Sequence, residues 1–377
     1  MCGKAARLPL PQAAAKTKPQ GFVSRRLASG CSFPEATRLA ATYNLQSSRY
    51  RQTDSAGENL PNGTRHTRDR NFPLFTFHYS LFTVFKGFDK MKIIDIITSD
   101  KPSLSMEVFP PKTTAAYESV QKATEDIASL KPSFMSVTYG AGGGTSDFTV
   151  SIASNIEKNY GVTALAHLSC ISSTKDQVKN QLRQLKENGI ENILALRGDI
   201  PNGMNTENLD YRYASELVSE IAETGDFCIG GACYPESHPE STDSFSDIRH
   251  LKEKADCGCQ FFTTQMFFDN DILYNFMYRI REAGITVPVV AGIMPVVNPK
   301  SIKRICSISG TALPQRFCRI VDKYGYDSEK MKQAGIAYAT EQIIDLYANG
   351  VNAVHIYSMN RPDVAEAIMR NVSKIIE

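Results

Sequence analysis

From residue 91 onward, short apolar runs alternate with longer amphipathic stretches. In the stretch TKDQVKNQLRQLKENG, Thr174 is a candidate N-cap, Val178, Leu182 and Leu185 share one helical face, and Gly189 is a candidate stop. This pattern predicts strands that are separated by helices. The eight runs of apolar, β-branched or aromatic residues begin at Ser103, Ser133, Val162, Asn192, Asp226, Cys259, Val287 and Val351.

The spacing of these runs indicates the fold class. The first runs begin about 30 residues apart, which is the length of a strand, a helix and the return to a parallel strand. Eight such units predict an α/β protein with a (β/α)8 TIM barrel over residues 91–377. One insertion is expected between the seventh and eighth strands, where about 55 residues can hold more than one helix. A doubly wound open sheet is the alternative, because the same alternation would build it.

Residues 1–90 have a different composition. They mix Ala, Ser, Arg, Pro and Gln with little periodicity, and their fourteen Lys/Arg against five Asp/Glu give a net charge of +9. We predict an unstructured leader, disordered or non-native to the fold, ahead of a working start at Met91. A targeting signal is an alternative, since a basic, Ser-rich and acid-poor start resembles an organellar transit peptide. A functional extension is the third possibility.

The charge, the cysteine content and the lengths of the apolar runs argue against several classes of protein. Residues 91–377 hold 28 basic and 35 acidic residues, a net charge of −7, which argues against nucleic acid as a partner. Nine cysteines without CxxC pairs predict a reducing, cytoplasmic location and no disulfide framework. Cys257-Gly-Cys259 lacks a second pair, so no metal site is expected. No apolar run of about 18 residues is present, so no membrane span is predicted.

Catalytic groups of a barrel project from the carboxyl ends of its strands. Polar residues follow seven of the eight predicted strands, and we expect them to converge on one rim. In chain order they are Glu107, Thr138, Tyr139, His167, Arg197, Gly198, Asp199, Tyr234, Glu236, His238, Gln265, Tyr357 and Arg361.

Glu107 is the strongest candidate for acid–base chemistry. It lies among Met106, Val108 and Phe109, before a rigid Pro-Pro turn. Apolar surroundings favour a protonated carboxyl at neutral pH, which suits a general acid. His167 is open to two interpretations, a satisfied core histidine or a ligand contact.

Two glycine-containing segments are candidate binding loops. The segment GAGGGTS at residues 140–146 only approximates GxGxxG, because Thr145 stands at the last glycine position. It predicts a loop that approaches a ligand closely, and not a dinucleotide fingerprint. The triplet Arg197-Gly198-Asp199 ends a strand of buried type in a chain without a secretory signal. We therefore interpret it as the mouth of an active site, and not as an adhesion motif.

Eight motifs together resemble, in order and spacing, the methylenetetrahydrofolate reductase family. They are EVFPPK, SVTYGAGG, AHLSC, LALRGDIP, YPESHPE, TTQMFFD, GIMP and HIYSMNR, and the similarity covers residues 92–377 but not residues 1–90. The resemblance implies the catalytic barrel of bacterial type, with FAD bound without a Rossmann fingerprint. It also implies NADH or NADPH as electron donor and reduction of 5,10-methylenetetrahydrofolate to 5-methyltetrahydrofolate.

The resemblance assigns roles to individual positions. It implies that Glu107 is the general acid and that Asp199 stabilises the iminium intermediate and tunes the flavin. The implied substrate-binding residues are Glu107, Gln265, Tyr357 and Arg361 on the folate and nicotinamide side. The implied FAD contacts are Thr138, Tyr139, His167, Arg197, Gly198, Asp199, Tyr213, Ala214, Tyr234, His238, Asp247 and Lys254.

Some positions depart from the family pattern. Lys252-Glu253-Lys254 stands where consecutive basic residues are expected near the flavin phosphates. Cys259 replaces a small alanine, while Ser301 and Ile305 replace a glutamine and an aromatic residue associated with ligand binding. The nicotinamide preference therefore stays open.

The resemblance also implies a homo-oligomer and, as in some bacterial relatives, possible dependence on an electron-transfer partner subunit. The chain stops at Glu377 without a regulatory domain, so no response to adenosylmethionine is expected. A barrel lyase or aldolase is an alternative, but it would need a strand-end lysine, and no predicted strand end carries one. A non-catalytic folate- or flavin-binding subunit is another, although it has no need of Glu107, Asp199 and Gln265 together.

Overall fold

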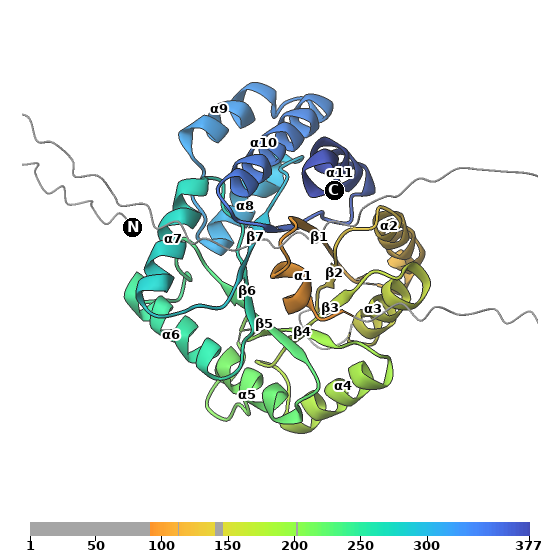
Figure 1. The fold of residues 1–377 in the computed structure, drawn as a ribbon, viewed down its shortest axis with the longest axis vertical. Coiled ribbons are helices and arrows are strands. Elements are labelled where there is room, and N and C mark those ends of the chain that lie inside the picture. The colour runs from red at the N-terminus through yellow and green to blue at the C-terminus, as the bar shows by residue number, and fades with distance from the viewer. Residues whose placement is uncertain (1–90, 112, 140–145, 201–202) are drawn as a thin grey trace, which may run out of the picture. The chain divides into compact units, whose positions relative to one another are not determined.

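The computed structural model describes residues 91–111, 113–139, 146–200 and 203–377, so the loop GAGGGTS lies outside the described residues except for its last position. Eight parallel strands form a closed barrel in sequence order, and β1 pairs with β8 through Ser103 and Ala353. The predicted (β/α)8 barrel is confirmed and the open sheet is excluded (Figure 1). The strands are β1 (Ser103–Val108), β2 (Met135–Val137), β3 (Ala164–Ser169), β4 (Asn192–Leu196), β5 (Cys228–Cys233), β6 (Phe261–Thr264), β7 (Val289–Ile293) and β8 (Ala353–Ile356).

Helices surround this ring of strands (Figure 1). Those that follow β1 to β6 are α2 (Tyr117–Ser129), α3 (Ser146–Tyr160), α4 (Lys175–Glu187), α5 (Ala214–Thr224), α6 (Ser244–Asp256) and α7 (Asn270–Glu282), and a short 3-10 turn, η1 (Thr114–Ala116), precedes α2. The last helix, α11 (Pro362–Ile376), follows β8.

The α4 helix begins and ends as its sequence predicts. The Thr174 side chain accepts a hydrogen bond from the backbone N–H of Gln177, and the Gln177 side chain accepts one from the backbone N–H of Thr174, which together form a capping box. Val178, Leu182 and Leu185 are buried, and Gly189 follows the helix with a positive φ of 84°.

Along the strands, alternate side chains face either the surrounding helices or the interior of the barrel. In β1, Leu104, Met106 and Val108 belong to the main hydrophobic cluster, in which the outer faces of the strands pack against the helices. Ser105 and Glu107 lie on the other face of the same strand, inside the barrel. Because side chains alternate along the strand, the carboxyl group of Glu107 lies in the barrel interior at the end of β1.

A short helix closes the N-terminal end of the barrel. Helix α1 (Ile93–Ile97) packs its isoleucines against strand residues that include Leu165, Leu194 and Phe261. The backbone N–H of Ile93 donates to Oδ1 of Asn192 at 2.8 Å, which ties the helix to β4. The interior is therefore covered by apolar side chains at this end.

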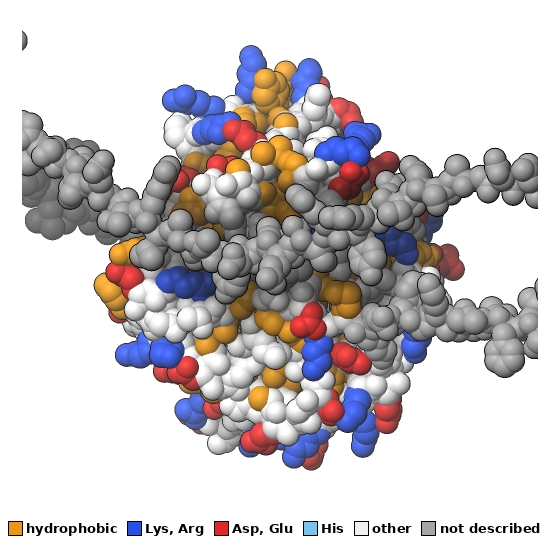
Figure 2. Space-filling view, viewed as in Figure 1, with side chains coloured by type: hydrophobic (Ala, Val, Ile, Leu, Met, Phe, Trp, Pro, Cys, Tyr) orange, Lys and Arg blue, Asp and Glu red, His pale blue; other side chains and the backbone are white. Residues whose placement is uncertain are grey.

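The predicted insertion between β7 and β8 is confirmed. It contains α8 (Pro299–Ser309) and α9 (Gln315–Tyr324), followed by the long α10 (Ser328–Ala348). The three helices enclose a separate hydrophobic cluster, in which the ring of Phe317 lies 5.2 Å from that of Phe268 and 4.6 Å from that of Tyr338. In Figure 2, Lys and Arg side chains are prominent at the upper end of the view, over α9.

Among the described residues no helix has the length and apolarity to cross a membrane.

Candidate active site

A cavity of about 1260 Å³ opens at the carboxyl ends of the strands. This volume exceeds the roughly 300–1,000 Å³ of a typical small-molecule site, so a dinucleotide and a second ligand can share it. Of the residues expected in the site, all but Glu236 and Arg361 line this cavity. They are Glu107, Thr138, Tyr139, His167, Arg197, Gly198, Asp199, Tyr213, Ala214, Tyr234, His238, Asp247, Lys254, Gln265 and Tyr357.

Glu107 and His167 form the floor of the cavity. Each is only 7% exposed, and Nε2 of His167 lies 3.8 Å from Oε2 of Glu107. Burial raises the pKa of Glu107 to about 8, while a hydrogen bond with Ser136 opposes the rise. Burial lowers the pKa of His167 to about 3. At neutral pH the pair is therefore a carboxylic acid beside a neutral imidazole, and not an ion pair.

A third buried residue, His355, lies beneath this floor. Its Nδ1 is 2.7 Å from Oγ of Ser105, and its Nε2 is 2.9 Å from Oγ of Ser136. Ser105 donates onward to the carbonyl oxygen of Val354. These residues were not among those predicted from the sequence for the site, although the alternation of Ser105 and Glu107 along β1 is a signal that could have pointed to them.

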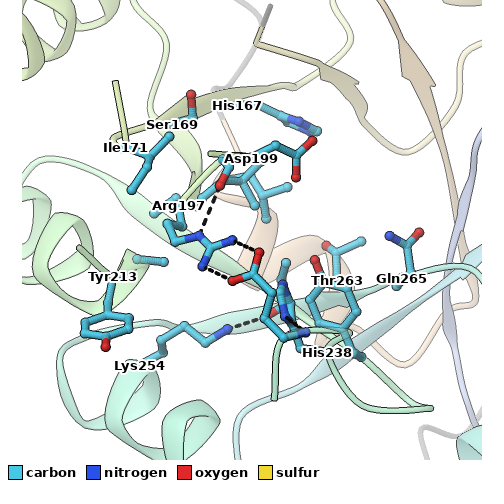
Figure 3. A pocket seen from close by; sticks show the side chains of 18 of the residues that line it. His167, Ser169, Ile171, Arg197, Asp199, Tyr213, His238, Lys254, Thr263 and Gln265 are labelled. Carbon is cyan, nitrogen blue, oxygen red and sulfur yellow. Dashed lines mark hydrogen bonds and ion pairs between the residues drawn. The ribbon is translucent and has the colours of Figure 1, made fainter. Parts of the chain in front are cut away.

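Arg197 crosses the mouth of the cavity from the end of β4. Its guanidinium donates to both carboxylate oxygens of Glu240, at 2.6 and 2.9 Å, and its Nε donates to the carbonyl oxygen of Gly198 (Figure 3). The ion pair raises the pKa of Arg197 and lowers that of Glu240. Glu240 belongs to the loop after β5, so this bidentate pair joins the ends of two adjacent strands.

Gly198 and Asp199 complete the RGD segment. Gly198 has a φ of +86°, and a side chain there would meet the Cβ of Ser169 at 3.1 Å, so the position requires glycine on two grounds. Asp199 is exposed to the cavity, close enough to Tyr234 to help raise the pKa of its hydroxyl to about 12, which is mainly an effect of burial. A carboxylate thus faces the open part of the cavity.

Lys254 approaches the cavity from α6 and not from a strand end. Its Nζ donates to the carbonyl oxygen of Ala232, and desolvation lowers its pKa against the opposing effects of Cys259, Cys233 and Asp247. Cys259, the departure from alanine, is buried beside this lysine and packs close to Gly231. The lysine is therefore engaged by the backbone, which does not favour the Schiff-base chemistry of a lyase or aldolase.

The loop after β5 is held in place around His238. The ring of His238 accepts a hydrogen bond at Nδ1 from the backbone N–H of Glu240, and its own backbone N–H donates to Asp247. Its ring meets that of Tyr234 edge-on, with the centroids 4.6 Å apart. Glu236 instead accepts a hydrogen bond from the backbone N–H of Ala312 and does not line the cavity.

Two exposed rings flank the outer part of the cavity. Those of Tyr213, at the start of α5, and His250, in α6, lie 6.3 Å apart and are within 12° of parallel. His250 also lies 3.1 Å from a carboxylate oxygen of Glu253. His250 was not predicted from the sequence, because its partner Tyr213 is 37 positions away in the chain.

On the opposite side, β6, β7 and β8 supply Gln265, Met294 and Tyr357. Gly292 lies beneath Tyr357, and a Cβ at this position would meet the tyrosine oxygen at 2.6 Å and the carbonyl oxygen of Thr264 at 2.5 Å. The Tyr357 hydroxyl donates to that same carbonyl. Ile305 of α8 lines the cavity here, where an aromatic residue was expected.

Arg361 lies outside the cavity lining. It precedes α11, and its guanidinium donates to both carboxylate oxygens of Asp363, at 3.0 and 2.9 Å. Asp363 also pairs with Lys332 at 2.5 Å. Of the HIYSMNR motif, Tyr357 therefore lines the cavity, whereas the Arg361 side chain is paired with Asp363 at the start of α11.

Sequence comparison identifies the family. The family model for methylenetetrahydrofolate reductase matches residues 92–373. The chain belongs to the methylenetetrahydrofolate reductase family. It is similar to the 5,10-methylenetetrahydrofolate reductases of Escherichia coli and Salmonella typhimurium, at 37% and 36% identity over 266 residues, which cover 71% of this chain and 89% of each relative. It is 34% identical over 305 residues to "Methylenetetrahydrofolate reductase (NADH) 1" of Arabidopsis thaliana, covering 76% of this chain and 52% of that protein.

A solved structure supports the barrel fold of this family member. It is an uncharacterized protein from Clostridium thermocellum that binds two copies of 5-methyl-5,6,7,8-tetrahydrofolic acid, and its TM-score is 0.53 at 15% sequence identity. The similarity covers 76% of this chain and 99% of that one, so it extends over the whole of the neighbouring structure.

The cavity fits the flavin that methylenetetrahydrofolate reductase chemistry implies. Nε2 of His167 and Oγ1 of Thr263 are buried without a hydrogen-bond partner among the described residues, although both residues line the cavity. Such atoms call for a ligand or water to satisfy them. The rings of Tyr213 and His250 offer faces to a planar group, and Arg197, although paired with Glu240, and Lys254, although bonded to the carbonyl oxygen of Ala232, place cations at the cavity.

Proposed function

We propose that this protein is an FAD-dependent enzyme that reduces 5,10-methylenetetrahydrofolate to 5-methyltetrahydrofolate with NADH or NADPH. The observation that carries the proposal is Glu107, a buried carboxyl that keeps its proton at neutral pH on the floor of the cavity. Family membership and the names of the bacterial relatives support the same reaction.

Glu107 acts as the general acid in this proposal. It donates its proton to the folate nitrogen that leaves the methylene carbon, and the electron pair of the broken C–N bond stays on that nitrogen. The methylene carbon remains on the second nitrogen as an iminium cation. A neutral His167 places no positive charge beside the acid and leaves it free to donate.

Asp199 stabilises the cation that this step creates. Its carboxylate faces the open cavity near Tyr234, where a negative charge favours a cationic intermediate over neutral folate. Gly198 carries no side chain at this point, so a flat ligand can come close to the backbone and to the Asp199 carboxylate. The same negative charge would disfavour the reduced, more electron-rich form of a flavin ring bound beside it.

The residues proposed to hold FAD are those on the β2 to β6 side of the cavity. Arg197 and Lys254 would bind its phosphates, Tyr213 and Ala214 would contact its outer end, and His167 would contact its ring system. When bound, FAD supplies the hydride that converts the iminium carbon to a methyl group. Gln265 and Tyr357 on the other side orient the folate and, in alternate turns, the nicotinamide.

The test is reconstitution of the purified protein with FAD, followed by anaerobic assay. A yellow protein whose visible absorbance bleaches with NADH or NADPH and recovers on addition of methylenetetrahydrofolate, with 5-methyltetrahydrofolate detected by mass spectrometry, supports the proposal. A colourless protein that cleaves a substrate carbon–carbon bond would point to the lyase alternative. Reduction by an artificial donor but by neither nicotinamide would indicate a partner subunit as the electron donor.

A further inference from the structure

The residues that follow Tyr357 in the HIYSMNR motif form a tight turn after β8. The backbone N–H of Arg361 donates to the carbonyl oxygen of Ser358 at 3.1 Å. The two residues between them, Met359 and Asn360, have positive φ angles of 55° and 54°. Positive φ at both central positions is characteristic of a type I′ turn, in which Gly, Asn and Asp prevail. Methionine rarely adopts this conformation, so the turn costs free energy that contacts elsewhere must offset.

The turn directs two polar side chains at the main chain of β1. Oδ1 of Asn360 accepts a hydrogen bond from the backbone N–H of Phe109 at 2.8 Å, and its Nδ2 donates to the carbonyl oxygen of Phe109 at 3.0 Å. The hydroxyl of Ser358, a residue that is only 2% exposed, donates to the carbonyl oxygen of Glu107 at 2.6 Å. These three bonds therefore hold the main chain at Glu107 and two positions after it.

The backbone pairing between β1 and β8 ends just before this point. Its last pair is Met106 with Ile356, one residue ahead of Glu107. Pro110 and Pro111 follow Phe109 and have no N–H, so they cannot donate to a neighbouring strand. The side chains of the turn therefore continue the attachment of β1 to β8 beyond the end of the ladder.

This attachment surrounds the candidate general acid. The Glu107 carboxyl lies 3.8 Å from His167, and both Phe109 and Met359 line the cavity above it. A general acid must lie within hydrogen-bond reach of the atom that takes its proton. A displacement of about 1 Å can lower the rate by roughly 100-fold. A main chain that moved at Glu107 would carry the carboxyl with it.

We propose that Ser358 and Asn360 are positioning residues for proton donation by Glu107. They fix the backbone of Glu107 and Phe109, so that the carboxyl meets the folate nitrogen in the geometry that the transfer needs. The inference rests on the proposed function and adds two residues to it. The strained turn at Met359 and Asn360 is the feature that brings the Asn360 amide to β1.

The test measures the two half-reactions of the FAD-loaded full chain by stopped flow. In Asn360→Ala we expect the limiting rate of flavin oxidation by methylenetetrahydrofolate to fall about tenfold or more, while flavin reduction by the nicotinamide stays within about twofold of the wild type. The KM for folate should change less than the limiting rate. Ser358→Ala should show the same pattern. Asn360→Asp keeps the acceptor for the Phe109 N–H and tolerates positive φ, so it should lose less than Asn360→Ala.

Asn192 provides a matched control at the opposite end of the barrel. Its side chain also joins two backbone groups, since Oδ1 accepts from the N–H of Ile93 at 2.8 Å and Nδ2 donates to the carbonyl oxygen of Ala164 at 3.3 Å. Like Ser358 it is buried, with 1% exposure. Asn192→Ala should therefore lower stability without a selective loss of the folate step.

Three results would overturn the inference. They are an equal loss in both half-reactions of Asn360→Ala, a change confined to the KM for folate, and the same selective loss in Asn192→Ala. If Asn360→Ala does not fold, Ser358→Ala and Asn360→Asp decide the matter by the same criteria. A wild-type protein whose flavin is reduced by the nicotinamide but not reoxidised by folate would contradict the proposed function, and this inference with it.

Discussion

The Oε2 atom of Glu107 lies 3.8 Å from Nε2 of His167, and burial favours the neutral form of both groups. A charged imidazole at this distance would stabilise the carboxylate and lower the pKa of Glu107, so that the carboxyl would be ionised at neutral pH and would have no proton to donate. The barrel interior prevents this, because its low polarity disfavours charge on either side chain. The pair therefore keeps a proton available at the floor of the cavity.

Replacement of Glu107 by glutamine keeps the shape and removes the proton. We expect FAD to stay bound and to be reduced by the nicotinamide at close to the wild-type rate, while folate reduction falls on the order of 100-fold or more. Stopped-flow measurement of the two half-reactions checks this. Near-normal folate turnover in Glu107→Gln would remove the residue from the mechanism.

The same variant should be more stable than the wild type at neutral pH. The folded state holds a proton on Glu107 with a pKa of about 8, whereas the unfolded chain releases it near 4.5. Between these values the folded state binds more protons, so the stability of the wild type falls as pH rises from 4.5 to 8. At pH 7 the effect amounts to about 3 kcal/mol and is absent from the glutamine variant. Urea unfolding at pH 4.5 and pH 7 measures it, and equal pH slopes for both proteins would contradict it.

Replacement of Asp199 by asparagine should separate two effects. Removal of the negative charge makes the flavin easier to reduce and raises its midpoint potential, while loss of cation stabilisation slows the folate step. A folding defect would impair both half-reactions together. An unchanged or lowered potential, combined with equal loss in both steps, would mean that Asp199 is structural.

Gly292 provides a test of the folate side. A methyl group at this position would meet the Tyr357 hydroxyl at 2.6 Å and the Thr264 carbonyl at 2.5 Å, so Gly292→Ala must displace the ring. We expect a loss of about 1–3 kcal/mol in stability and a raised KM for folate. Tyr357→Phe, which keeps the ring and removes only the hydrogen bond to Thr264, is the control. Unchanged KM and stability in Gly292→Ala would show that the ring relocates without consequence.

A protein that starts at Met91 tests the proposed boundary of the barrel. Because β1 begins at Ser103 and α1 at Ile93, every described element lies downstream of Met91. We expect this shorter protein to fold, bind FAD and match the full chain in activity. Loss of solubility or of flavin binding would place a required element within residues 1–90.

The sequence predicted the architecture well because the relevant signals are local. Strand alternation in β1 places Glu107 inside the barrel, and the cap at Thr174 and apolar spacing of α4 follow standard helix chemistry. These features depend on residues at most a few positions apart. The presence of eight strand–helix units then predicts that the sheet closes into a barrel.

Contacts between distant residues were not predictable in the same way. His355 is 250 positions from Ser105 and 219 from Ser136, and Arg197 is 43 positions from Glu240. Such pairs depend on the barrel register and on loop conformations, which periodicity does not encode. Arg361 shows the converse, since its motif suggested the site while its side chain is paired with Asp363 outside the cavity.

Helix α1 has a consequence for the supply of protons. Its isoleucines, together with Leu194 of β4 and Phe261 of β6, cover the lower end of the barrel, so the described residues leave the cavity as the path between Glu107 and bulk water. A seated ligand blocks this path. Under the mechanism proposed above, Glu107 would take up its proton from water between turnovers, while the mouth of the cavity is open, so the proton used in one cycle would come from water that entered before that cycle began.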